Sequence, residues 1–169
     1  MPRSRHATVG RALLAGSLLA LSTPAVVTVS VSDAGAADQW INLALNDAGE
    51  IHVPPDSLGP QDYVLATYAE SLDELPAPAS AQARAPGRLP KGCLPVVRVD
   101  TASGLRELPQ PAELSFGCAD LPANAQISAW TGDAWHPLKT DRLPDGRLHA
   151  QFTQTAVYGV FVPPDVPRI

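Results

Sequence analysis

The chain has 169 residues, with 17 acidic residues against 12 basic ones and a formal net charge of −5. An acidic surface repels phosphate backbones and anionic lipids, so we expect neither nucleic-acid binding nor membrane-surface binding. The 18 prolines also argue against long helices.

The N-terminal segment has the order of a secretory signal. Arg3, Arg5 and Arg11 come first, followed by an uncharged apolar run at 12–21 and by the small residues of 34–37. A basic start, an apolar middle and a small-residue cleavage site are the three parts of an export signal.

We therefore predict a cleavable signal peptide at 1–37, cut after Ala36 or Ala37, and a single mature domain at 38–169. The alternative is an uncleaved membrane anchor at 12–31, which approaches the length that crosses a bilayer. Cleavage leaves 9 basic and 16 acidic residues, a formal charge of −7. The predicted location is secreted or extracytoplasmic, in the periplasm or the cell wall, without stable membrane insertion after cleavage.

The mature chain opens with a predicted hairpin. Segments 40–45 and 50–53 flank Asn46-Asp47-Ala48-Gly49, which is rich in turn residues. The next strand is expected at 63–69, and a single helical turn is expected at 71–75.

Segment 76–92 is rich in Pro and Ala and has few large apolar side chains. We expect it to be an exposed loop of the same domain. A hinge between two domains is the rival interpretation, but the mature residues before it are too few to fold alone.

Two cysteines, Cys93 and Cys118, lie in the mature part. An even number in an exported chain favours a disulfide, and the alternative is two free thiols. Each lies on the apolar face of an alternating segment, at 93–99 and 112–118. Inward cysteines on neighbouring or opposed strands meet the geometric need of a disulfide. The bridge closes a loop of about 26 residues and stabilises the fold by roughly 3.5 kcal/mol on the chain-entropy model.

A second hairpin is predicted at 125–130 and 135–138, with Gly132-Asp133 in the turn. That register sets Trp130 directly opposite Trp135. On a solvent face, the two indoles form a candidate binding surface for sugar rings or for the apolar patch of a partner. On an inner face, they are part of the core and stabilise the hairpin.

The last strands are expected at 147–152 and 156–162, and Pro163-Pro164 ends the second. Short strands at this spacing, without helices between them, predict an all-β fold. We expect an antiparallel β-sandwich of about seven or eight strands, with a partly open β-barrel as the alternative.

The order of four segments resembles the ZU-five type β-sandwich domain of ankyrins, netrin receptors, tight-junction scaffold proteins and bacterial exported proteins. The segments are 49–58, 94–116, 127–138 and 146–162. The resemblance implies a binding or spacing module without a cofactor. Some members of the family cleave themselves at a His-Phe-Ser triplet before the final strand. The corresponding residues here are Gln154, Thr155 and Ala156, so self-cleavage is not expected.

Catalytic chemistry has little support in the sequence. The mature histidines, His52, His136 and His149, lie outside any nucleophile motif. The carboxylate pairs Asp73-Glu74 and Asp141 with Asp145 fall in expected loops. No calcium-loop spacing or zinc-ligand spacing is present, so we expect no metal site.

We therefore expect a non-catalytic interaction or structural module that meets a protein or another component of the bacterial cell envelope. One alternative is a carbohydrate-binding module that uses Trp130 and Trp135. Another is a proteinaceous inhibitor of secreted hydrolases that presents 83–90 as bait.

Overall fold

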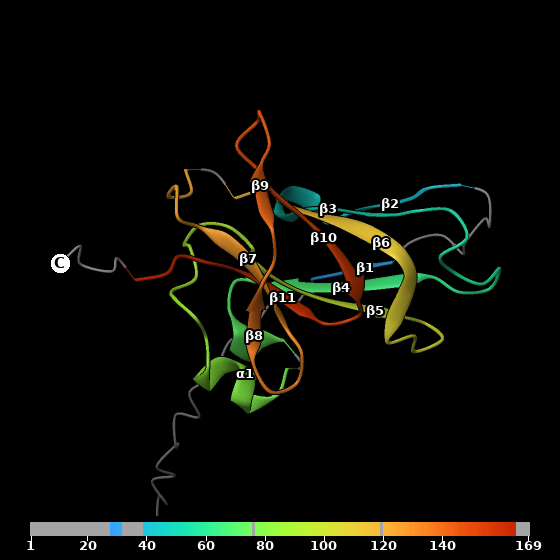
Figure 1. Ribbon diagram of the computed structural model, residues 1–169, viewed down its shortest axis with the longest axis horizontal. Coiled ribbons are helices and arrows are strands. Elements are labelled where there is room, and N and C mark those ends of the chain that lie inside the picture. Colours follow the sequence, from blue (N-terminus) through green and yellow to red (C-terminus); the bar gives the residue numbers. More distant parts are fainter. Residues whose placement is uncertain (1–27, 32–38, 76, 119, 165–169) are drawn as a thin grey trace, which may run out of the picture.

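The computed structural model describes residues 28–31, 39–75, 77–118 and 120–164. These residues form two antiparallel β-sheets, with a core of apolar side chains between them (Figure 1). The predicted all-β sandwich is confirmed, and the sheets do not close into a barrel.

The sheets have six and five strands. In spatial order, the first sheet contains β1 (Thr28–Val31), β4 (Val64–Ala69), β5 (Val96–Thr101), β11 (Val157–Phe161), β7 (Gln126–Trp130) and β8 (Trp135–Pro137). The second contains β2 (Ile41–Ala44), β3 (Gly49–Val53), β6 (Glu107–Phe116), β10 (Leu148–Gln154) and β9 (Thr140–Arg142). The short helices are η1 (Asn46–Ala48), η2 (Leu72–Glu74) and α1 (Ala79–Ala83).

The described residues therefore hold more strands than the seven or eight expected. The strands that were not expected are β1, with four residues, and β9, with three, and both lie at sheet edges. The predicted hairpins are confirmed, with Ile41 paired to Val53 and Trp130 paired to Trp135. The helical turn expected at 71–75 is η2.

The core follows the alternation of the strands. Leu148, Ala150 and Phe152 of β10 are buried, whereas Gln151 between them is exposed. A polar contact also crosses the sandwich, because Asn46 of η1 donates its side-chain amide to the hydroxyl of the buried Tyr68 on β4 at 2.8 Å. The two sheets are thus joined by a specific hydrogen bond as well as by apolar packing.

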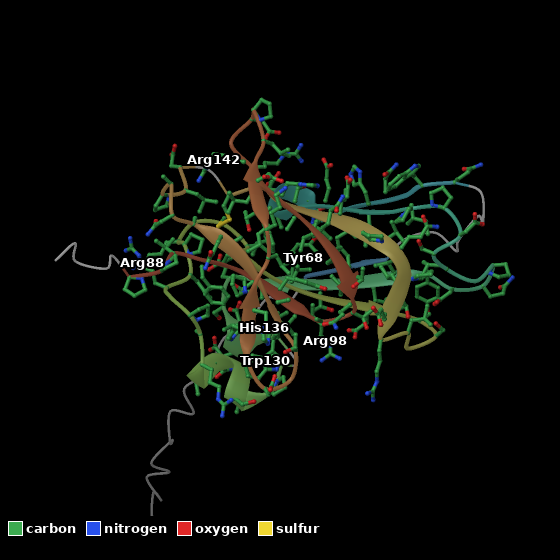
Figure 2. All side chains as sticks on the ribbon, in the orientation of Figure 1. Tyr68, Arg88, Arg98, Trp130, His136 and Arg142 are labelled. Carbon is green, nitrogen blue, oxygen red and sulfur yellow. A yellow bond between two sulfur atoms is a disulfide. The ribbon has the colours of Figure 1, made fainter. Side chains whose placement is uncertain are left out.

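The predicted disulfide is present. Cys93 and Cys118 are bonded, with Cα atoms 5.3 Å apart (yellow in Figure 2). Both cysteines lie just outside the strands, Cys93 before β5 and Cys118 after β6. Because β5 and β6 belong to different sheets, the bridge ties the two layers together.

Most of the described residues of the expected exposed loop, 77–92, are exposed or half-buried, but the segment is not entirely loop. Its residues 79–83 form α1, in which Ala81 is fully buried, and Leu89 is half-buried. Together with η2, α1 lies over the outer face of the six-stranded sheet and closes a second apolar cluster there. The physical reason is size, since the methyl group of Ala81 lets the backbone approach the large side chains of that cluster.

Strand β1 falls inside the predicted signal peptide. Its residues 28–31 pair with 65–68 of β4 in antiparallel register. The apolar run at 12–21 and the cleavage site at Ala36 and Ala37 lie outside the described residues, so export and cleavage stay predictions. Within the described ranges, no helix has the length and apolar character that a membrane crossing needs.

Candidate functional site

The predicted tryptophan pair forms part of a second core. Trp130 and Trp135 face each other across the β7–β8 hairpin with ring centroids 5.6 Å apart, and the rings of Trp135 and Phe161 form a T-shaped pair with centroids 4.7 Å apart. Trp130 is only 4% exposed and Trp135 is half-buried. Figure 2 shows Trp130 at the end of the sandwich where α1 lies.

A hydrogen bond holds α1, the short helix that covers this pair, against the β7–β8 hairpin. The indole N–H of Trp135 donates to the carbonyl oxygen of Ala81 in α1 at 2.8 Å. Because Trp130 is buried, it offers no open stacking platform for a sugar. The structure therefore agrees with the alternative in which the pair is part of the core.

The segment considered as inhibitor bait, 83–90, is anchored at both ends. The exposed Arg84 donates from its guanidinium to the carbonyl oxygen of Asp133 in the β7–β8 turn. Arg88 forms a two-way backbone bridge with Val162, with N···O distances of 3.2 Å and 2.8 Å. These contacts hold the segment against the domain.

The outer face of the five-stranded sheet has a different character. Most of its outward positions along β3, the second half of β6 and β10 are polar and, apart from Ser115, exposed or half-buried, whereas Ala44 of β2 and Pro111 of β6 are exposed apolar positions. We call this surface the polar face. It consists of Asn42, Glu50, His52, Glu113, Ser115, Arg147, His149 and Gln151.

Strand register explains how these residues come together. Glu50 and His149 both lie opposite Ser115, because β6 is paired with β3 on one side and with β10 on the other. His52 and Gln151 likewise lie opposite Glu113. Since alternate residues of a strand share one face, two rows of polar side chains cross the middle of the sheet.

One ion-pair chain runs along the polar face. The guanidinium of Arg147 lies between two carboxylates, 2.7 Å from Asp145 and 3.1 Å from Glu50. Glu50 in turn lies 3.0 Å from Nε2 of His52. Each of these side chains therefore has at least one polar or oppositely charged neighbour within hydrogen-bonding distance.

The titration behaviour reflects these contacts. The hydrogen bond with His52 has the largest effect on the pKa of the Glu50 carboxyl and lowers it. Burial raises this pKa by a smaller amount, and Arg147 lowers it further. The backbone N–H of Arg147 and its guanidinium lower the pKa of Asp145. The hydrogen bond to Asp145 is the main cause that raises the pKa of Arg147. All three groups therefore favour their charged forms.

A second pair lies beside this chain. Nε2 of His149 is 3.7 Å from a carboxylate oxygen of Glu113. Two shallow hollows meet at His149: one of about 180 Å³, bounded also by Glu50 and Ser115, and one of about 200 Å³, bounded also by Asp141 and Gln151. The polar face is thus uneven, with His149 at its centre.

The polar face places one serine beside a histidine. Ser115 lies in the first hollow beside His149, but its hydroxyl makes no hydrogen bond to that imidazole within the described part of the chain. A serine needs such a base to become reactive. Among the described side chains, no three His, Cys, Asp or Glu groups are placed to share a metal ion.

The structure brings two of the three mature histidines together. His52 and His149 share the polar face, whereas His136 is exposed on β8 of the other sheet. Sequence reasoning did not single out Glu50, Glu113 or Arg147. The signal for them was the alternation of polar residues at outward positions, as in Arg147-x-His149-x-Gln151, but the pairing of β3, β6 and β10 was needed to join the rows.

No protein-family model, curated protein or solved structure matches the chain. The resemblance to the ZU-five type domain stays a prediction.

Proposed function

We propose that the protein is a non-catalytic extracytoplasmic interaction module and that it binds a protein of the cell envelope through the polar face. The observation that carries this proposal is the difference between the two outer faces of the sandwich. The part of the outer face of the six-stranded sheet that carries the tryptophan pair is covered by η2 and α1, while its Arg98–Asp100 ion pair is only half-buried. The polar face of the other sheet is left accessible.

The chemistry of the polar face suits a protein partner. It offers carboxylates at Glu50 and Glu113 and cationic or hydrogen-bonding groups at Arg147, His52 and His149. Charges of both signs at fixed positions select a complementary pattern on a partner and reject a uniformly charged polymer. Because the side chains stand on paired strands and already bond one another, little conformational entropy is lost on binding.

Extracytoplasmic placement rests on the predicted signal peptide and is compatible with the Cys93–Cys118 bridge. The two alternatives have less support from the contacts described above. A sugar platform needs open indole faces, and a bait loop needs a segment that projects freely from the domain.

A photo-crosslinking residue placed at Gln151 tests the proposal in the cells that produce the protein. Gln151 is exposed at the middle of the polar face, and Gln82 is exposed on α1 over the other sheet, so Gln82 is the matched control site. We expect a defined protein adduct from Gln151 and none from Gln82. An adduct from Gln82 alone would contradict the assignment of the surface.

The charge pattern is tested in the same experiment. The double variant Glu113→Gln with His149→Gln keeps side-chain size and removes both groups of one pair, and it should abolish the adduct from Gln151. Turnover of an ester, peptide or glycoside substrate by the purified protein, lost in Ser115→Ala, would overturn the non-catalytic assignment.

A further inference from the structure

The outer edge of β4 is occupied by a segment that export is predicted to remove. Residues 28–31 of β1 form the edge of the six-stranded sheet, with Thr28 opposite Tyr68 and Ser30 opposite Ala66 (Figure 1). The predicted cut after Ala36 or Ala37 lies downstream of β1. Cleavage there separates β1 from the domain and makes β4 the new edge strand.

The β4 strand lacks the features that protect natural sheet edges. Short length, charged side chains, proline and bulges are the usual means of blocking edge-to-edge pairing. Strand β8, at the opposite edge of the same sheet, has three residues and ends in Pro137, and β9 has three residues including Asp141 and Arg142. By contrast, β4 has six uncharged residues, VLATYA, in unbroken register with both neighbours.

The backbone of β4 presents hydrogen-bonding groups to this edge. The carbonyl oxygen of Tyr63 accepts a hydrogen bond from the N–H of Ala102, which lies just after β5. The backbone N–H and carbonyl of Tyr63 therefore point toward β5. Backbone groups alternate in direction along a strand, and those of Ala66 therefore point toward β1. Loss of β1 leaves an N–H and a carbonyl of Ala66 directed out of the sheet.

We propose that the outer edge of β4 is a strand-acceptor site, which residues 28–31 fill in the uncleaved chain and a strand of a partner protein fills after cleavage. The occupant is an extended, uncharged segment rich in β-branched residues, added in antiparallel register. We infer this chemistry from residues 28–31, which pair with β4 in the structure and have the sequence Thr-Val-Ser-Val. The site depends on the predicted cleavage and is independent of the polar face, which belongs to the other sheet.

The test uses the exported, cleaved protein and a fluorescent peptide with the sequence of residues 26–33. Intact mass identifies the N-terminus and the disulfide, and circular dichroism confirms the β-fold. The matched control peptide is methylated on the backbone nitrogens of Thr28 and Ser30. These residues lie opposite Tyr68 and Ala66, so their N–H groups point to β4, and methylation removes both donors while keeping every side chain.

We expect saturable binding of the unmodified peptide, measured by fluorescence anisotropy, and binding at least about tenfold weaker for the methylated peptide, because two hydrogen bonds are lost. Hydrogen exchange at the Ala66 amide should slow when the unmodified peptide is bound. Equal affinity of the two peptides, or no saturable binding, overturns the proposal. It is also overturned if the exported product retains β1, fails to fold without it, or closes the β4 edge by forming a dimer that takes up no peptide.

Discussion

Trp135 of the β7–β8 hairpin donates its indole N–H to the carbonyl oxygen of Ala81, at 2.8 Å and 54 residues earlier in the chain. This bond fastens α1 to the outer face of the six-stranded sheet, where the rings of Trp130 and Phe161 pack against Trp135. The part of this outer face around Trp130 is thereby converted into core. The polar face on the other sheet is left as the surface with fixed, accessible charges.

The contribution of this contact is measurable by substitution. Trp135→Ala removes a half-buried ring, its contacts with Trp130 and Phe161, and one hydrogen bond, and it should lower the free energy of unfolding by about 3 kcal/mol. The matched control is Trp40→Ala, because Trp40 is 52% exposed, and its effect should stay within about 0.5 kcal/mol. Urea denaturation followed by circular dichroism compares the two, and equal effects would mean that Trp135 is not part of a core.

The disulfide should stabilise the fold mainly by restricting the unfolded chain. The double variant Cys93→Ala with Cys118→Ala is expected to lose roughly 3.5 kcal/mol of unfolding free energy in urea. Reductant should destabilise the wild-type protein by a similar amount and leave the double variant unchanged. Wild-type protein that is insensitive to reductant would show that the bridge does not form.

Acid should weaken the contacts of Glu50. Its folded pKa lies below the ordinary value of 4.5, so the stabilisation is complete above that value and is lost as the pH falls through the lower, folded pKa. Glu50→Gln should therefore cost up to about 1 kcal/mol near neutral pH, because the pair is partly exposed, and the two stability curves should converge in acid. The control is Glu107→Gln, an exposed carboxylate at the start of β6. A gap between Glu50→Gln and wild type that persists unchanged in acid would argue against this ion pair.

Close backbone contact at Gly49 gives a sharper test of the β3–β6 register. Gly49 has φ of 144°, and a Cβ there would lie 1.8 Å from the carbonyl oxygen of Ser115. Gly49→Ala should destabilise the protein by more than about 3 kcal/mol, because backbone has to move. Gly59→Ala has no atom within 4 Å of the added Cβ and should be nearly neutral. Thermal unfolding of both variants measures the difference, and a tolerated Gly49→Ala would contradict the pairing of Gly49 with Phe116.

The sequence predicted those parts of the fold that depend on local alternation. The β2–β3 and β7–β8 hairpins and the position of Trp130 opposite Trp135 follow from a two-residue period and turn residues between the segments. The disulfide was also predicted correctly, but its cysteines lie just outside the strands on which the alternation placed them. Strand β1 was missed because its residues were assigned to the signal peptide, and β9 was missed because Thr140–Arg142 contains no apolar residue that could show an alternation.

The candidate site was harder to predict because it depends on strands that are distant in the chain. Glu50, Glu113 and His149 come from β3, β6 and β10, which become neighbours only through the topology of the sheet. The cover over Trp130 was missed for a related reason. Segment 79–83 reads as a loop beside its prolines, and its helical turn is stabilised by packing of Ala81 beneath η2 and the tryptophans.

Hydroxyl-radical footprinting of the folded protein tests most directly the difference between the two outer faces. Trp40 serves as an internal standard, since it is exposed, and His52 reports on the polar face with a side chain that is 38% exposed. Trp40 and His52 should be oxidised readily, whereas Trp130 and Trp135 should be protected until the protein unfolds. Oxidation of Trp130 and Trp135 at the rate of Trp40 would contradict the account.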